Sequence, residues 1–222
     1  MNDILEQIAH CVEFGKVNKD APYPPDMKGR DGADELTRKA LDEGLGAEKI
    51  LKNALVIGMD RVGKKFTEKK IFIPQMLMSA KAMNAAIEHL KPFFNSGEVK
   101  RKGKFIIATV QGDLHDIGKN LVKMAIEGAG WEVIDLGVDV KSEKIIGALK
   151  QNPEALLGLS ALLTTTMQNM QNIVQSVKDE FPQNKIIIGG APVNNDFCEK
   201  IGADYYAPDP HGAVSYLNKI AS

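Results

Sequence analysis

One histidine lies beside acidic residues on a segment that follows an apolar run. The run Phe105–Val110 predicts a buried β-strand, and His115 comes shortly after it. Imidazole is a common ligand of transition metals, and a ligating histidine often donates its other ring N–H to a carboxylate, a role for which Asp113 is placed. In open α/β sheets ligands bind at the carboxyl ends of the strands. The segment therefore favours a metal site, with an ordinary loop hydrogen bond as the alternative.

Two further short motifs follow later apolar runs. Ser160–Leu162 comes directly after the run 155–159, and Gly189–Gly190 follows the run 185–188. Together with residues 113–118, these motifs resemble the fingerprint Asp-x-His-x-x-Gly, Ser-x-Leu and Gly-Gly of cobalamin-binding proteins. The resemblance implies a cobalamin or related corrinoid cofactor, bound base-off/His-on, with His115 as the axial cobalt ligand in place of the cofactor's own dimethylbenzimidazole. It also implies that the displaced nucleotide tail enters a channel between the sheet and its helices.

The residue types in these motifs suit such a tail. Glycine leaves room for a flat base and a ribose phosphate, and Ser160 offers a hydroxyl that both donates and accepts hydrogen bonds. The segment 206–210 is expected to line the same pocket. The resemblance implies cofactor contacts for a set of loop and strand-end residues: Gly112, Asp113, Leu114, His115, Asp116, Ile117, Gly118, Ser160, Leu162, Thr164, Thr166, Gly189 and Gly190.

A threonine after the second motif extends the expected site. Methionine synthase has a serine at the position of Thr166, where it completes a hydrogen-bonded relay beneath cobalt. The resemblance implies a Thr166–Asp113–His115 relay, which adjusts the protonation of the lower ligand as cobalt changes oxidation state. His115 must be neutral to bind the metal, so we expect the lower bond to depend on pH.

The hydrophobic pattern that must position these residues changes its period near residue 95. Upstream, helical spacing over 4–12, 34–44, 47–66 and 74–94 predicts an N-terminal four-helix bundle cap, residues 1–95. Residues 96–103 are expected to form a linker and hinge. Downstream, five apolar runs alternate with helical segments, which predicts a doubly wound, flavodoxin- or Rossmann-like five-stranded parallel sheet over residues 104–222.

The helical half carries a second resemblance. The stretch 58–83 is similar to the helical cap that precedes the corrinoid domain in methionine synthase and in corrinoid proteins of anaerobic methyltransferase systems. In that family, cap side chains cover the upper face of the corrin, and Phe66 and Ile73 occupy the matching positions here. The alternative is that both residues fill the core of the bundle, since apolar residues at helical spacing usually do so.

Composition excludes several classes of protein. The chain of 222 residues carries 28 Lys and Arg against 29 Asp and Glu, so it lacks the basic excess of nucleic-acid binders. Cys11 and Cys198 form no close pair, which argues against a disulfide framework or a zinc site. A signal peptide and an uninterrupted apolar stretch of membrane-spanning length are both missing, so we expect a cytoplasmic protein.

The resemblance implies a carrier that is not catalytic alone. It would accept a methyl group from a substrate-specific corrinoid methyltransferase and present it to an acceptor methyltransferase that uses tetrahydrofolate or a thiol. A reductive activator would reduce cobalt that has been oxidised to Co(II). The first alternative is a cobalamin-binding sensor. The second is a flavodoxin-like or nucleotide-binding module, which the lack of phosphate-binding glycine motifs after the first strand disfavours. The methyl donor stays open.

Overall fold

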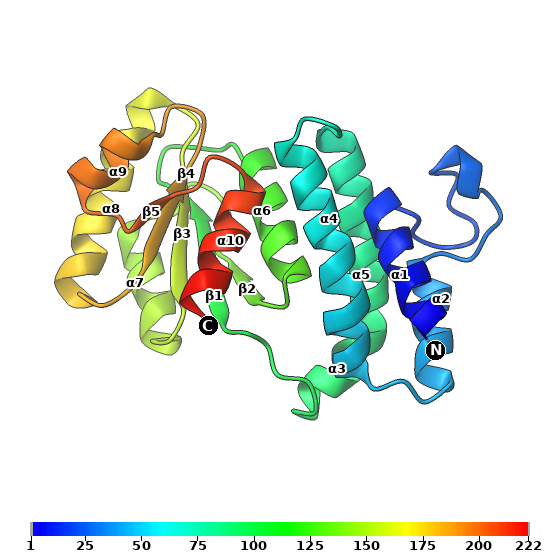
Figure 1. The fold of residues 1–222 in the computed structure, drawn as a ribbon. Coiled ribbons are helices and arrows are strands. Elements are labelled where there is room, and N and C mark those ends of the chain that lie inside the picture. Colours follow the sequence, from blue (N-terminus) through cyan, green and yellow to red (C-terminus); the bar gives the residue numbers. More distant parts are fainter. Residues whose placement is uncertain (1, 222) are drawn as a thin grey trace. The chain divides into compact units, whose positions relative to one another are not determined.

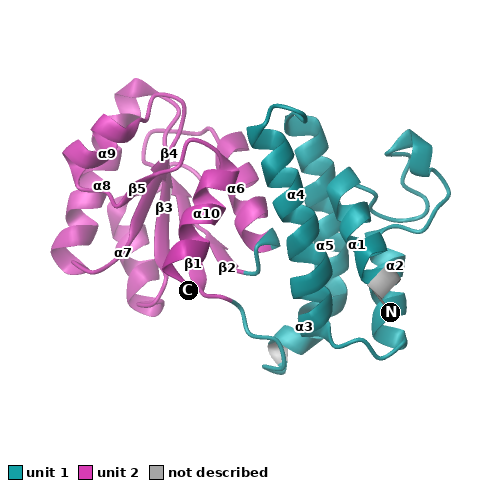
Figure 2. Ribbon diagram, viewed as in Figure 1, with its two compact units in different colours: residues 1–101, 128–130 teal, residues 102–127, 131–222 magenta. Residues whose placement is uncertain are grey.

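The computed structural model describes residues 2–221, so residues 1 and 222 at the outer ends of the two predicted domains lie outside the described range. The chain divides into two compact units (Figure 2). Unit 1 runs to Arg101 and includes Gly128–Gly130, whereas unit 2 holds Lys102–Glu127 and the chain from Trp131 onward.

Unit 1 is helical in its described part (Figure 1). Its helices are α1 (Asn2–Phe14), α2 (Ala33–Asp42), α3 (Ala47–Ile50), α4 (Val56–Thr67) and α5 (Ile73–Asn95). A π-helical turn, Leu51–Leu55, joins α3 to α4, so these two form one long helical segment. Helix α1 packs against α2, α4 and α5, and its buried face repeats at helical spacing through Leu5, Ile8 and Val12.

Unit 2 contains a parallel sheet in the order β2-β1-β3-β4-β5. The strands are β1 (Lys104–Thr109), β2 (Glu132–Asp135), β3 (Leu156–Ser160), β4 (Ile186–Gly189) and β5 (Tyr205–Tyr206). The helices between and after them are α6 (Ile117–Gly128), α7 (Ser142–Gln151), α8 (Met167–Glu180), α9 (Asn195–Ile201) and α10 (Pro210–Ile220). Short 3-10 turns occur at Pro25–Met27 in unit 1 and Thr164–Thr166 in unit 2.

The two faces of the sheet differ in packing. One face buries Ile106, Leu157 and Ile188 against helices α7, α8 and α9, and this is the main core of unit 2. The opposite set of side chains alternates along the same strands, as the two-residue period of a strand requires. That second face points toward α6 and α10 (Figure 1). Its residues Ile107, Ser160 and Gly189 line the cavity that is described below.

The predicted fold class is confirmed: a helical N-terminal region precedes a five-stranded parallel sheet with helices on both faces. Several predicted boundaries are wrong by one residue. The last strand but one ends at Gly189 instead of residue 188, and the third strand includes Ser160. Both strands keep the predicted length but are shifted by one residue toward the C-terminus, because the pairing of Ser160 with Gly189 continues past the apolar run. None of the described helices combines the length and apolar character needed to cross a membrane.

Candidate functional site

His115 lies on the loop between β1 and α6, with half of its side chain exposed. Its Nδ1 is 2.7 Å from Oδ1 of Asp113, and its backbone N–H donates to the same oxygen at 3.1 Å. The hydroxyl of Thr109, at the end of β1, donates to the His115 carbonyl at 2.9 Å. When Nδ1 carries the proton for Asp113, Nε2 keeps its lone pair on the exposed side of the ring. The contacts with Asp113 and Thr109 therefore fix the position of the His115 imidazole and leave Nε2 without a role in them.

The Asp113 carboxylate is fully buried and joins two loops. Its Oδ2 accepts hydrogen bonds from the backbone N–H groups of Leu162 and Leu163 at 2.7 and 3.2 Å. Burial raises the pKa of this carboxyl, but the hydrogen bonds from Leu162, His115 and Thr166 outweigh that effect and hold the pKa well below its usual range. Asp113 is therefore a fixed anion beneath His115.

Thr166, at the end of a 3-10 turn after β3, completes the cluster. Its hydroxyl lies 2.9 Å from Asp113 Oδ2 and 2.8 Å from the Leu163 carbonyl oxygen. A hydroxyl has one proton, so Thr166 donates to only one of these acceptors at a time. The predicted arrangement of Thr166, Asp113 and His115 in one hydrogen-bonded chain is present in the structure.

Large apolar side chains on these two loops and at the start of α6 are exposed. Leu114 and Ile117 flank His115 with exposed fractions of 71% and 68%, and Leu162 on the β3 loop is exposed by 44%. Exposed apolar side chains grouped beside a polar site are typical of a ligand-binding surface. Thr164 is also exposed, whereas Asp116 accepts a hydrogen bond from the Asn120 amide at 3.0 Å.

A cavity of about 370 Å³ lies between the sheet and helices α6 and α10. Gly118, Ser160, Gly189 and Gly190 line it, as do all residues of the segment 206–210. A Cβ atom at Gly118 would meet no atom within 4 Å, so this position opens onto free space. Cavities of this size are typical of small-molecule sites.

Gly190 has a separate structural reason to be glycine. Its φ is +131°, and a Cβ atom there would lie 1.8 Å from the Ala161 carbonyl oxygen. Any side chain at Gly190 therefore strains the backbone in addition to narrowing the cavity.

Comparison with known proteins agrees with this geometry. Two family models, each described as a B12 binding domain, match residues 103–214 and 29–91. A corrinoid protein of Desulfitobacterium hafniense (strain Y51) is 37% identical over 191 residues, covering 84% of this chain and 88% of that protein. Dimethylamine corrinoid protein 1 of Methanosarcina mazei is 38% identical over 174 residues, which are 77% of this chain and 81% of the relative. The chain belongs to the corrinoid protein family.

Solved structures support membership of the corrinoid protein family. A cobalamin-binding protein from Desulfitobacterium hafniense DCB-2 superposes with a TM-score of 0.75, at 30% identity and 97% coverage of both chains. A chain of the methanol:cobalamin methyltransferase complex from Methanosarcina barkeri gives a TM-score of 0.81 at 29% identity, covering 99% of this chain and 80% of that one. The cofactor of the present chain is accordingly cobalamin or a related corrinoid, as the sequence predicts.

The residues present fit a corrinoid on two structural observations. The His115 side chain is half exposed and its Nδ1 is held by Asp113, so Nε2 is the nitrogen that would bind a metal. The cavity lined by Gly118, three residues after that histidine, has a volume that would suit a nucleotide tail. These residues are the ones that would hold the cofactor.

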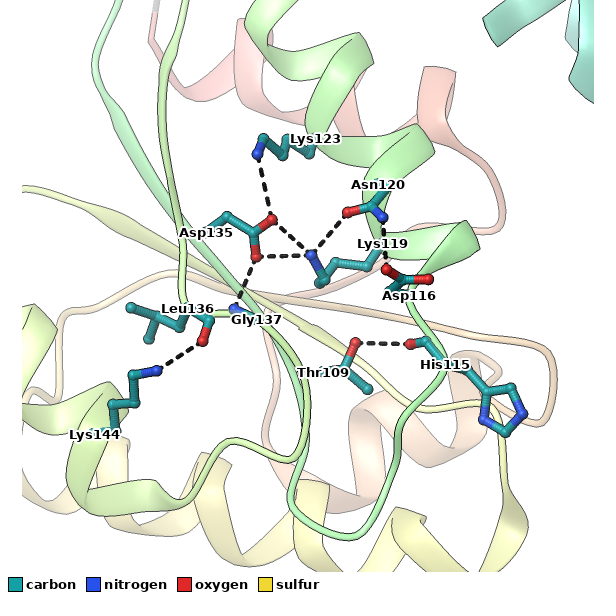
Figure 3. Close-up of polar contacts among 10 residues, drawn as sticks. All are labelled: Thr109, His115, Asp116, Lys119, Asn120, Lys123, Asp135, Leu136, Gly137 and Lys144. Atoms are coloured by element: carbon teal, nitrogen blue, oxygen red, sulfur yellow. Dashed lines mark hydrogen bonds and ion pairs between the residues drawn. The ribbon is translucent and has the colours of Figure 1, made fainter.

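A buried ion pair beside the cavity was not predicted from the sequence. Lys119 is only 3% exposed, and its Nζ lies 2.7 Å from each carboxylate oxygen of Asp135 and 2.9 Å from Asn120 Oδ1. Burial raises the pKa of Asp135, but the hydrogen bonds from Lys119 and the Gly137 N–H lower it by more. Figure 3 shows this network, with the His115 ring pointing away from it. A lysine in an amphipathic helical pattern ordinarily indicates an exposed position, so the pattern does not predict the burial of Lys119. The nearest signal in the sequence is the adjacent motif residue Gly118.

The two expected cap residues lie in unit 1. Phe66 is half-buried near the end of α4, and Ile73 begins α5 with 42% of its surface exposed. Met76 is instead buried in the bundle. Contact of Phe66 and Ile73 with a corrin stays a prediction.

Replacing Lys119 by Met should lower the free energy of unfolding by about 3 kcal/mol, because the mostly buried Asp135 carboxylate loses its closest cation. The matched control is Lys123→Met, whose Nζ lies 3.4 Å from Asp135 and whose side chain is 32% exposed. We expect the control to cost less than about 1 kcal/mol. Urea denaturation of both variants measures the difference, and equal losses would contradict the assignment.

Proposed function

We propose that this chain is a corrinoid methyl carrier that binds its cofactor base-off/His-on. In this proposal His115 is the axial ligand of cobalt, and the nucleotide tail occupies the cavity lined by Gly118, Ser160 and Gly189. The observation that carries the proposal is the half-exposed His115 imidazole, which is hydrogen-bonded through Nδ1 to the buried Asp113 carboxylate. A cavity with open space at Gly118 follows on the same loop and helix.

The named functions of relatives support methyl carriage. Relatives of the chain include corrinoid proteins named for dimethylamine and trimethylamine, and one matching structure is a methanol:cobalamin methyltransferase complex. We infer that the partners of this chain are a substrate-specific methyltransferase and an acceptor methyltransferase, together with a reductive activator of Co(II). The names span several donors, so they do not select one for this chain.

In the proposed function the residues around His115 have separate roles. A bound corrinoid supplies a cobalt centre that can accept and release a methyl group. Asp113 holds the proton on His115 Nδ1 and so keeps Nε2 available as a ligand. The Thr166 hydroxyl stabilises the Asp113 charge when it donates to Oδ2. This stabilisation is lost when the hydroxyl donates to the Leu163 carbonyl oxygen instead. Leu114, Ile117 and Leu162 exclude water around the ligand.

The helical unit has a proposed role through Phe66 and Ile73. Both are apolar, and Ile73 is exposed at the start of α5. In the proposal they shield the upper face of the corrin from solvent, and residues 96–103 act as the hinge that lets two methyltransferases approach in turn.

Methyl carriage is tested with the whole chain. The protein is loaded with hydroxocobalamin, reduced, labelled with radioactive iodomethane and freed of excess reagent. Addition of the acceptor methyltransferase from the same organism should move the label to tetrahydrofolate or to a thiol. Uptake of the corrinoid without enzyme-dependent loss of label would favour the sensor instead.

Replacing His115 by Ala should remove the nitrogen ligand of cobalt and leave the fold intact, because the side chain is half exposed and lies on a loop. Electron paramagnetic resonance of the Co(II) protein should then lose the hyperfine splitting caused by the imidazole nitrogen. The exposed His10 on α1 provides the control, since His10→Ala should keep the splitting. Retention of the splitting in His115→Ala would refute the ligand assignment.

Replacing Gly118 by Leu should fill part of the cavity that this residue lines and weaken binding of cobalamin at least ~100-fold, a change of about 2.7 kcal/mol. The residue has no neighbour within 4 Å of a Cβ atom, so the protein should still fold. Gly147 on α7 is equally open and lies outside the cavity, which makes Gly147→Leu the control. Titrations followed by visible absorption give the affinities. Wild-type affinity in a folded Gly118→Leu protein would show that the tail binds elsewhere.

A further inference from the structure

The polarity of the cavity changes along the strands. Thr109, Ser160 and Gly189 are register partners at the carboxyl ends of β1, β3 and β4. Ile107, Gly158 and Ile187 form the next row on the same face, and Phe105 lies one further step inward on β1. Four residues of a strand span roughly 13 Å, so the lining runs about that far from the Ser160 row to Phe105.

The inner end is closed by an aromatic ring. Phe105 is fully buried, and its ring lies so close to Gly158 that a Cβ atom there would be 2.4 Å from the nearest ring carbon. Leu121 and Val122 of α6 line the same cavity as Ile107 and Ile187. The innermost surface is therefore made of hydrocarbon side chains.

The charged groups of the lining are engaged elsewhere. Lys119 Nζ directs its three contacts to the Asp135 carboxylate and to Asn120, which matches its three N–H donors. Asp209 lies after β5 at the outer end, where its Oδ1 caps α10 by accepting from the Gly212 N–H at 2.7 Å. Polar partners therefore lie near the rim, where the ribose and phosphate of a tail would enter.

We propose that this apolar inner end selects corrinoids whose lower base is a benzimidazole over those whose base is a purine. The inference rests on the proposed function, since it requires the tail to occupy the cavity. Dimethylbenzimidazole places two methyl groups at its far edge, which suit Phe105, Ile107 and Ile187. Adenine places an exocyclic amine and ring nitrogens there, and a polar group buried without a partner loses its hydrogen bonds to water.

Binding of three corrinoids to the cofactor-free chain tests the inference. Cobalamin carries dimethylbenzimidazole, adeninyl cobamide carries the purine, and cobinamide has no nucleotide tail. We expect cobalamin to bind at least ~10-fold more tightly than adeninyl cobamide, a ratio that one unpaired polar group accounts for. Equal affinities for the two tailed corrinoids, both tighter than cobinamide, would overturn the inference and leave the proposed function standing. Equal affinities for all three would show that the tail does not enter the cavity, and would overturn both.

A near-isosteric variant links the selectivity to the lining. Val122→Thr replaces one methyl group by a hydroxyl inside the cavity, and we expect it to reduce the preference for cobalamin over adeninyl cobamide at least ~3-fold, since a new partner relieves part of the desolvation cost. The control is Val133→Thr on the edge strand β2, which is outside the cavity lining and should keep the wild-type ratio. An unchanged ratio in Val122→Thr, with the fold confirmed by circular dichroism, would overturn the assignment of the inner end as the selecting surface.

Discussion

The carboxylate of Asp113 holds the site together. It accepts five hydrogen bonds, from the backbone and ring of His115, from the backbone of Leu162 and Leu163, and from the Thr166 hydroxyl. Three of these donors belong to the loop after β3, and the others belong to the loop after β1. A charge buried without such donors would be costly, so the two loops can adopt this conformation only together. The orientation of the His115 ring follows from that constraint.

The same arrangement explains why the cofactor surface can be apolar. Backbone N–H groups of His115, Leu162 and Leu163 supply three of the five hydrogen bonds to Asp113, so these three bonds do not use the side chains at positions 162 and 163. Leu114, Ile117 and Leu162 are apolar and exposed on this side, and in the proposed function they face the corrin. The same pair of loops thus holds the hydrogen-bonded network around Asp113 in its interior and exposes apolar side chains at its surface.

Much of this was accessible from the sequence, for identifiable reasons. Period and motif spacing gave the strand–loop–helix units, and with them the placement of His115, Ser160 and Gly189 at neighbouring strand ends. The Lys119–Asp135 pair was not accessible, because the burial of a lysine on helix α6 depends on a carboxylate partner from strand β2. Gly158 was also missed, since its importance comes from the Phe105 ring on the neighbouring strand. The sequence reveals local roles, whereas packing between strands appears only in three dimensions.

The close approach of Phe105 to Gly158 makes the depth of the cavity a property of two positions at once. A larger residue at 158 displaces the ring, and a smaller residue at 105 leaves the space beneath glycine unfilled. Neither position can change alone without strain or a void, so a deeper or shallower cavity requires paired substitutions across β1 and β3. The shape of the cavity and the packing of the sheet therefore depend on the same two residues, so a change in cavity depth between relatives should appear as a correlated substitution at positions 105 and 158.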